Sequence, residues 1–381
     1  MNMNFDDIRP YDDSEMRQAL QRIAHSPEFE SVAAYVYPST PLEQVREQFM
    51  AIETIEQLQS TVMYDLIKHI IDTTITQFSF SGVEQLTPGQ NYLFVSNHRD
   101  IVLDANLLVY VMFLHNFPPV QITFGANLMS HPVVADAGKC NRMFKVERGG
   151  NPKEFYTNLR HVSLYMRHVL ADRHESVWIA QRNGRTKDGD DHTEVALVKM
   201  LGLYDSKPTA ETYSSLRIVP VTISYEWEPC DLLKVREVCL THKQGSYTKQ
   251  SGEDLVSILT GIRSPKGQVH ISFNKPVDAE DLRSLHGGGS ALAEQLAQLL
   301  TRRIREGYRL MPTNYVAYDL LHGDTRYADH YTPAQKQCFL DRLSQVQATD
   351  GLDIETLRQQ FLTLYANPVG SLSAIHPPFT T

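Results

Sequence analysis

The N-terminal part of the chain repeats apolar residues at helical spacing. From Ser14 to about Thr76 they recur every three to four positions, with polar residues between them, as on one face of a helix. Pro38 and Pro41 interrupt the repeat, because proline is tolerated in the first turn of a helix but not in its interior. The pattern predicts a helical region over residues 1–77, with shorter helices and then a long helix that begins near Pro41. Packing in a core is favoured over docking on a membrane for its apolar face.

Between Phe78 and Val277 short apolar runs alternate with helical stretches. Runs that are apolar along nearly their whole length are typical of strands buried on both faces, and helices between strands make the crossovers of a parallel sheet. We therefore expect an α/β core with a largely parallel sheet over residues 78–277. Pro220 lies inside one run, which indicates an edge strand, a bulge or a special backbone path. The predicted strands are 92–96, 120–124, 143–147, 177–181, 216–226 and 269–273, and the predicted helices lie near 104–114, 152–171 and 194–203.

The last part of the chain, residues 278–381, returns to helical periodicity after the glycine-rich segment His286–Ser290. That segment is either a domain boundary or a loop before a docked helix. The tail from Asn367 to Thr381 contains three prolines and is expected to be a loosely packed end. The predicted fold class is therefore α/β, with a largely parallel-sheet core flanked by N-terminal and C-terminal helical regions.

Composition and charge exclude several classes of protein. With 42% hydrophobic and 21% charged residues, the 381-residue chain is ordinary for a globular protein. Its 36 Lys and Arg against 45 Asp and Glu give a formal net charge of -9, so it has no general attraction to nucleic acid. The four cysteines form no CxxC pair and the N-terminus shows no signal-peptide pattern, which favours a reducing, cytoplasmic location. The longest apolar run, Leu107–Leu114, is less than half of the roughly 20 residues that span a bilayer.

His98 is the strongest candidate for chemistry. It follows a predicted strand and precedes an apolar helix, and ligands of open α/β sheets bind where strands end. Asp100 and Asp104 are close enough in sequence for one of them to hold the imidazole in a single tautomer, as a general base requires. Positions six apart in a helix point about 120° away from each other, so Asp104 reaches His98 only if His98 lies in a turn before the helix. We favour Asp104.

Two later strands run into cationic glycine turns. One ends in Arg148 before two glycines, and the other runs into Gly184, Arg185 and Lys187. A guanidinium beside exposed backbone amides can hold a phosphate or a carboxylate with paired hydrogen bonds. Taken alone, the first also fits a strand that simply ends in a glycine turn. The second equally fits a solvated loop, because three aspartates close behind it balance its charge.

Taken together and in this order, these segments resemble the glycerolipid acyltransferase family, which esterifies glycerol-3-phosphate and lysophosphatidic acid. The family's first motif, a histidine with an aspartate after four residues, is similar to SNHRDIVLD at 96–104. The other family motifs are an apolar strand ending in Arg, a strand running into Glu-Gly and Arg, an apolar run with a central Pro, and a closing strand. They resemble FKVER (144–148), IAQRNGR (179–185), IVPVTI (218–223) and VHISFNKPV (269–277). The resemblance covers about residues 78–277.

The sequence departs from the family pattern at two places. Five residues separate His98 from Asp104 instead of four, so either the turn carries one extra residue or Asp100 takes the orienting role. Asn183 occupies the family's glutamate position. An asparagine still accepts and donates hydrogen bonds, so it either preserves the loop while altering how the acceptor is handled or marks weakened activity.

The resemblance implies an acyltransferase core and a role in phospholipid biosynthesis. The implied reaction is direct transfer of a fatty acyl group from acyl-CoA or acyl carrier protein to a hydroxyl of glycerol-3-phosphate or lysophosphatidic acid. His98 would act as general base and Asp104 would orient it. The implied substrate-binding residues are Asn97, Arg99, Arg148, Gly184, Arg185 and Lys187. No metal and no cofactor beyond the acyl thioester co-substrate are expected.

The partners expected from this resemblance are an acyl thioester donor, acyl carrier protein among them, a phosphate-bearing lipid acceptor and a membrane surface, and no nucleic acid. The protein is thus expected to be cytoplasmic and peripherally membrane-associated. The N-terminal helices or Leu107–Leu114 would line an apolar groove for the acyl chain. Two alternatives remain: a catalytically weakened lipid-binding protein of the same fold, and an O-acyltransferase acting on an N-acyl amino acid. A serine esterase, suggested by the HGGG at 286–289, is rejected because the chain has no GxSxG sequence.

Overall fold

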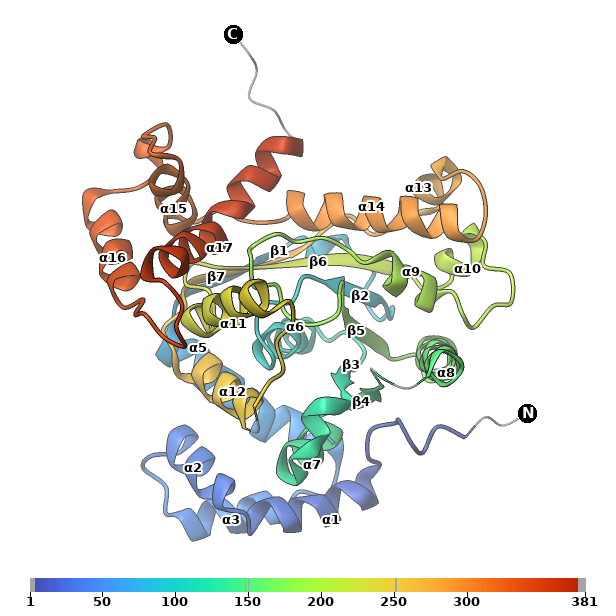
Figure 1. Ribbon diagram of the computed structural model, residues 1–381. Coiled ribbons are helices and arrows are strands. Elements are labelled where there is room, and N and C mark those ends of the chain that lie inside the picture. Colours follow the sequence, from blue (N-terminus) through green and yellow to red (C-terminus); the bar gives the residue numbers. More distant parts are fainter. Residues whose placement is uncertain (1–3, 148, 150, 251, 376–381) are drawn as a thin grey trace.

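The computed structural model describes residues 4–147, 149, 151–250 and 252–375, and at its centre lies a seven-stranded sheet (Figure 1). The strand order is β1-β7-β6-β2-β5-β3-β4. Neighbouring strands are parallel except β6 and β7, which are antiparallel. The predicted α/β class with a largely parallel sheet is confirmed. The strands are β1 (Ile75–Ser81), β2 (Leu93–Ser96), β3 (Val120–Gly125), β4 (Met143–Val146), β5 (Ser176–Ala180), β6 (Ile218–Tyr225) and β7 (Gly267–Phe273).

The strand β1 is one that the hydrophobic pattern did not predict. Its sequence ITQFSFS mixes exposed and half-buried positions, because β1 is an edge strand and pairs only with β7. The region expected to be helical up to Thr76 therefore ends in a strand that begins at Ile75. The other six strands lie within two residues of the predicted runs at each end.

Pro220 lies in β6, an inner strand between β7 and β2, so the expected edge position is wrong. Its carbonyl accepts a hydrogen bond from the backbone of Asn274 at 2.9 Å, on the β7 side of the strand. The N and C=O of one strand residue point to the same side, so its ring nitrogen also faces β7. The paired residues of β6 and β7 begin only at Val221. The N–H that Pro220 lacks would therefore point past the end of the β6–β7 pairing, so no hydrogen bond of that pairing is lost and the strand needs no bulge there.

Helices on both faces cover the sheet (Figure 1). The predicted helices of the core are present as α6 (Leu103–Leu114), α8 (Pro152–Ala171) and α9 (Val195–Leu201). α6 is apolar on nearly all sides and buries Leu103, Leu107 and Leu108 completely. The remaining helices of this region are α7 (Pro132–Cys140), α10 (Ala210–Ser214), α11 (Asp231–Gln244) and α12 (Glu253–Arg263), with short 3-10 turns at Val83–Gln85 and Ala126–Ser130.

The N-terminal region is helical, but the long helix expected from Pro41 is wrong. α3 ends at Met50, and Thr54 then caps a new helix by accepting a hydrogen bond from the backbone of Gln57. Because a threonine cap starts a helix rather than continuing one, the chain turns there. The elements are α1 (Asp13–Ala24), α2 (Pro27–Val36), α3 (Leu42–Met50), α4 (Ile55–Leu58), a π-helical turn (Gln59–Met63) and α5 (Tyr64–Thr74).

The C-terminal region is a helical layer, with α13 (Ala279–Ser284), α14 (Ser290–Glu306), α15 (Pro312–His322), a 3-10 turn (Ala328–His330), α16 (Pro333–Ser344) and α17 (Ile354–Ile375). The glycine-rich segment forms the loop before α14, and α14 packs Leu292 and Leu296 into the same core as β2 and β5. The expected loose tail is wrong for residues 367–375, because α17 continues through Pro368 and buries Val369. Residues 376–381 lie outside the described part of the chain.

Candidate active site

His98 lies in the irregular segment between β2 and α6, at the carboxyl end of the parallel strands. β2 has parallel neighbours on both sides, β5 and β6, so the segments that follow β2 and β5 meet above one edge of the sheet. The backbone of Thr186, which follows β5, donates a hydrogen bond to the carbonyl of His98 at 2.7 Å. The fold thus brings the first and third sequence motifs into direct contact.

Asp104 is the carboxylate that contacts His98. Nδ1 of His98 lies 2.9 Å from Oδ2 of Asp104, and the Asp104 side chain is fully buried. The backbone N–H groups of Arg99 and Asp100 donate to the same oxygen, and the Tyr225 hydroxyl donates to Oδ1 at 2.8 Å. Asp104 is the second residue of α6, and His98 lies in the turn before that helix. That turn accommodates the extra residue between them.

The remaining ring nitrogen of His98, Nε2, has no hydrogen-bond partner among the described residues, and the side chain is 14% exposed. The His98 ring meets Trp178 edge-on, with centroids 5.5 Å apart and planes at 73°. The imidazole is therefore held by a carboxylate on one side and an indole on another. With Nδ1 bonded to a carboxylate, Nε2 is the nitrogen that can accept a proton.

Asp100 caps α6 instead of orienting His98. Its Oδ1 accepts from the backbone of Val102 and Leu103, both at 2.9 Å. Its Oδ2 is buried, has no partner in the described segments of the chain and lies against Gly261 of α12, where a Cβ would approach it to 2.1 Å. Burial, and next the neighbouring charge of Asp104, raise the pKa of Asp100.

Asn97 and Arg99 flank His98 but face into the protein. The Asn97 amide bonds to both N and O of Ile223 in β6 and to Asp191. Arg99 is fully buried, with ion pairs to Asp191 and Glu228 and its guanidinium 5.2 Å from the Tyr308 ring. Burial opposes the charged form of Arg99, but the two carboxylates outweigh it and hold its pKa well above the ordinary value. Their predicted part in substrate binding stays a prediction, and the bonds they make are to protein groups.

Arg185 and Lys187 lie in the segment after β5, beside His98. Arg185 is 6% exposed; Nη2 bonds to Oγ of Ser257 in α12 at 3.3 Å, and Nη1 is buried without a partner among the described residues. Lys187 pairs with Glu237 of α11 at 2.6 Å, and burial lowers its pKa against the pull of that carboxylate. Gly184 has a φ of +76° with open space around its Cα, and Asn183 is exposed. A guanidinium nitrogen that has no partner in the described part of the chain and lies next to the His98 segment is what an anionic substrate group would need.

Arg148 lies outside the described residues, so its predicted place in the site stays a prediction. Asp191 is the residue that the sequence did not single out. In the sequence it is one of three aspartates that balance a cationic turn, yet in the structure it is 4% exposed and accepts hydrogen bonds from Asn97, Arg99 and Thr186. The Asp-Asp pair at 190–191 directly after a cationic turn is the only sequence signal that pointed to it.

A cavity of about 380 Å³ runs along α6 from Asn106 in its first turns to Phe117 beyond its end. Its other wall comes from the N-terminal helices, so both segments expected to line an apolar groove do line this one. The apolar lining residues are Met63, Tyr64, Ile67, Val109, Tyr110, Met112, Phe113, Phe117, Pro118, Pro119 and Val120. The polar lining residues are Glu56, Gln59, Asn106, Asn116, Asn141 and Arg142.

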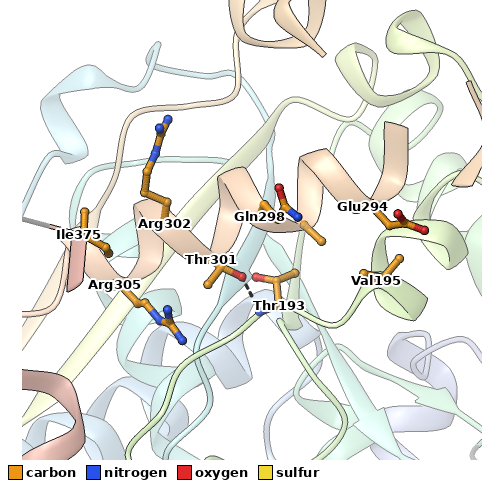
Figure 2. A pocket seen from close by; sticks show the side chains of 9 residues that line it. Thr193, Val195, Glu294, Gln298, Thr301, Arg302, Arg305 and Ile375 are labelled. Atoms are coloured by element: carbon orange, nitrogen blue, oxygen red, sulfur yellow. Dashed lines mark hydrogen bonds between the residues drawn. The ribbon is translucent and has the colours of Figure 1, made fainter. Parts of the chain in front are cut away.

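A second cavity, of about 450 Å³, lies between α14, the start of α9 and the end of α17 (Figure 2). The backbone of Thr193 donates to Oγ1 of Thr301 there at 2.8 Å. Arg302 and Arg305 point to opposite sides of α14 in this view. Arg305 is engaged with Asp190 and with the carbonyl of Asp191. The two guanidinium groups therefore do not converge on a common ligand.

No helix within residues 4–375 that the structure describes is both long and apolar enough to cross a membrane. In the same part of the chain, no group of three or more His, Cys, Asp or Glu side chains is placed to hold a metal ion.

Proteins of known sequence resemble this chain over most of its length. It is 21% identical over 339 residues to a glycerol-3-phosphate acyltransferase of Pseudomonas putida KT2440, a match that covers 81% of this chain and 39% of that protein. It is 25% identical over 258 residues to a glycerol-3-phosphate acyltransferase of Pseudomonas fluorescens SBW25, which covers 64% of this chain and 29% of that protein. The chain thus spans less than half the length of the curated relatives it matches. These relatives confirm the resemblance to the glycerolipid acyltransferase family.

No family model matches the chain. Among solved structures, the 1-acyl-sn-glycerophosphate (LPA) acyltransferase from Thermotoga maritima aligns with a TM-score of 0.39 and 12% identity, over 76% of this chain and 94% of that one.

Proposed function

We propose that this chain, a relative of the glycerolipid acyltransferases, transfers a fatty acyl group from acyl-CoA or acyl carrier protein to a hydroxyl of glycerol-3-phosphate or lysophosphatidic acid. The observation that carries the proposal is the pairing of His98 with the buried Asp104, 2.9 Å apart, at the carboxyl end of β2. This pairing leaves Nε2 of the imidazole for the substrate.

In the proposed reaction Nε2 of His98 takes the proton of the acceptor hydroxyl while the oxygen attacks the thioester carbonyl. A C–O bond forms, the C–S bond breaks, and the proton passes from the imidazolium to the leaving thiolate. Asp104 holds the ring and stabilises the imidazolium, and such general-base catalysis contributes roughly 10²- to 10⁴-fold. The transfer is direct, so it requires no metal, and a chelator is expected to leave the rate unchanged.

The acceptor phosphate is proposed to bind Arg185, whose Nη1 is buried beside the His98 segment and has no partner within the part of the chain that the structure describes. Gly184, Lys187 and Arg148 belong to the same proposed site. Arg185 is 6% exposed under α12, so the phosphate reaches it only when α12 moves aside. Among the described residues of α12, only Ser257 and Gly261 are buried, so little apolar surface holds this helix in place.

The acyl chain is proposed to occupy the cavity beside α6. The cavity combines a mostly apolar lining with a start at Asn106, two residues beyond Asp104. An apolar cavity of this size suits a hydrocarbon chain, because burying each CH₂ group contributes about 0.8 kcal/mol. Because the acceptor or the product belongs in a bilayer, we place the reaction at a cytoplasmic membrane surface, which cosedimentation with phospholipid vesicles would test.

The test is acyl transfer from labelled acyl-CoA and acyl carrier protein to glycerol-3-phosphate, lysophosphatidic acid and an N-acyl amino acid. We compare the wild type with His98→Ala and with His286→Ala, an exposed histidine in the loop before α14. Esterification that survives in His286→Ala and is lost in His98→Ala supports the proposal and identifies the acceptor.

Two other outcomes would favour the alternatives. Esterification of the N-acyl amino acid alone would favour an O-acyltransferase acting on N-acyl amino acids. The carboxylate of that acceptor is an anion, as the phosphate is, so it could bind Arg185 in the same way. Binding of lipid without esterification of any acceptor, equal in wild type and His98→Ala, would favour a lipid-binding protein that has lost turnover.

A further inference from the structure

We infer that Asp191 is a positioning residue that fixes the general base and the acceptor-binding segment relative to each other. The inference rests on the proposed function. Asp191 is 4% exposed, and its two carboxylate oxygens accept hydrogen bonds from four side chains. Each oxygen serves a different segment of the site.

Oδ2 of Asp191 serves the segment of His98. It accepts from the amide of Asn97 at 3.0 Å and from Nη2 of Arg99 at 2.5 Å. These two residues are the immediate neighbours of His98 on either side, so one oxygen holds the backbone of the general base from both directions. A histidine held only by its own side-chain bond to Asp104 would be free to shift with its loop.

Oδ1 of Asp191 serves the segment of Arg185. It accepts from Oγ1 of Thr186 at 2.9 Å and from Gln181 at 3.4 Å, residues that lie on either side of the turn after β5. The backbone of Thr186 also donates to the carbonyl of His98 at 2.7 Å. The residue next to Arg185 is thus bonded to Asp191 and to His98 at once.

Asp191 is itself held in a single place. Its backbone carbonyl accepts a hydrogen bond from Nε of Arg305 in α14 at 2.7 Å. Its partner Arg99 is held in turn by a second ion pair, with Glu228. A small displacement between a base and its substrate can lower a rate by about 100-fold. Asp191 bonds to α14 through its backbone and to both segments through its carboxylate, so it sets the distance between Nε2 of His98 and an anion on Arg185.

Two variants test the inference at different strengths. Thr186→Val keeps the shape of the side chain and removes one bond of Asp191, so we expect the acceptor KM to rise roughly fivefold while kcat and the donor KM stay within twofold. Asp191→Asn disturbs both segments, so we expect kcat to fall roughly 100-fold and the acceptor KM to rise as well. Rates are given per folded molecule, with the folded fraction measured by urea unfolding.

Asp281→Asn is the matched control. It removes a carboxylate that pairs with the largely buried Arg303 at 2.6 Å, but Asp281 lies in α13 and bonds to neither segment of the site. It is expected to lower the stability without changing kcat or either KM. Should Asp191→Asn fail to fold, Thr186→Val still decides the question through the acceptor KM.

Two outcomes distinguish this inference from the proposed function. A wild type that esterifies no acceptor refutes the proposed function, and the inference with it. A wild type that does esterify an acceptor, with unchanged kcat and KM per folded molecule in both variants, overturns the inference alone and leaves Asp191 a purely structural residue.

Discussion

Oδ2 of Asp104 lies 2.9 Å from Nδ1 of His98, six residues earlier in the chain and outside the helix that carries Asp104. Asp100, only two residues from His98, bonds to the N-terminal backbone of the same helix instead. The two carboxylates therefore have different tasks, although the sequence made both of them candidates for orienting the imidazole.

Asparagine substitutions at the two positions separate these tasks. In the proposed mechanism Asp104→Asn replaces the charge that stabilises the imidazolium, so kcat is expected to fall by roughly 100-fold or more. Asp100→Asn keeps a side-chain oxygen that can accept from the backbone of Val102 and Leu103. It removes only a buried carboxyl group, whose pKa is raised by burial, so kcat is expected to stay within threefold. Steady-state kinetics would contradict this assignment if the larger loss fell on Asp100→Asn.

The hydroxyl of Tyr225 tunes this pair through Asp104. It is fully buried and donates to Oδ1 of Asp104 at 2.8 Å, so it withdraws charge from the carboxylate that faces His98. Tyr225→Phe removes only that bond. The carboxylate then attracts a proton on the imidazole more strongly, and the acidic limb of the kcat/KM profile is expected to move to higher pH by a few tenths of a unit.

The control for this measurement is Tyr308→Phe, which removes a buried hydroxyl that bonds to no side chain of the pair. Its profile is expected to coincide with that of the wild type. A Tyr225→Phe profile that keeps its shape and position while only the stability falls would show that the tyrosine merely packs.

A disulfide should test whether α12 must move for the acceptor to enter. The Cys230 thiol donates to the carbonyl of Ser257 at 3.2 Å, and Ser257 also bonds to Arg185, so Ser257→Cys places a second thiol within reach of the first. Oxidised Ser257→Cys is expected to lose at least tenfold of its activity, and a reductant is expected to restore it.

The matched control is Ser257→Cys combined with Cys230→Ser, which carries the same new side chain but forms no bridge. Its activity is expected to be the same under oxidising and reducing conditions. Full activity of the bridged protein, with the bridge verified by mass, would mean that the acceptor reaches Arg185 without displacing α12.

The cavity beside α6 predicts a change in the chain length of the donor. Val109 lines this cavity, and Val109→Trp fills part of it with an indole. The variant is expected to prefer acyl donors several carbons shorter than those preferred by the wild type, as measured by competition between acyl-CoA species. Val32→Trp, at an exposed position outside the cavity, is expected to keep the wild-type profile. An unchanged preference in Val109→Trp would place the acyl chain elsewhere.

Local sequence patterns predict most of the strands and the position of His98. The sequence predicts six of the seven strands because their runs are apolar along nearly their whole length, and all of these except β4 are inner strands of the sheet. His98 was singled out because it follows such a strand, a relation that needs no knowledge of distant contacts. β1 is missed because its sequence ITQFSFS mixes polar with apolar residues, whereas β4, the other edge strand, carries a mostly apolar run.

The role of Asp191 was not predictable, because it depends on contacts between distant residues. Its partners Asn97 and Arg99 lie more than ninety positions earlier in the chain. Next to Asp188 and Asp190, the residue has the sequence context of a solvated acidic loop. Only the pairing of β2 with β5, which brings the two loops together, shows that Asp191 points inward.

Lys266 gives a prediction about stability and pH. It is fully buried just before β7, and its ammonium donates to Thr74, to the carbonyl of Ile262 and to the carbonyl of Ser264. Burial lowers its pKa from 10.5 to about 8, although the charge of Asp100 opposes the shift. The folded state therefore binds fewer protons than the unfolded state between these two pH values, and the free energy of unfolding is expected to rise with pH in that window.

Lys266→Met isolates this effect from the other groups that titrate at alkaline pH. The stability of the wild type minus that of Lys266→Met is expected to be constant below pH 8 and to increase by about 3 kcal/mol towards pH 10.5, since each pKa unit corresponds to about 1.4 kcal/mol. Urea unfolding of both proteins between pH 7 and 10.5 measures the difference. A difference that does not change with pH would mean that Lys266 keeps its ordinary pKa, with its buried charge compensated by Asp100 and the surrounding carbonyls.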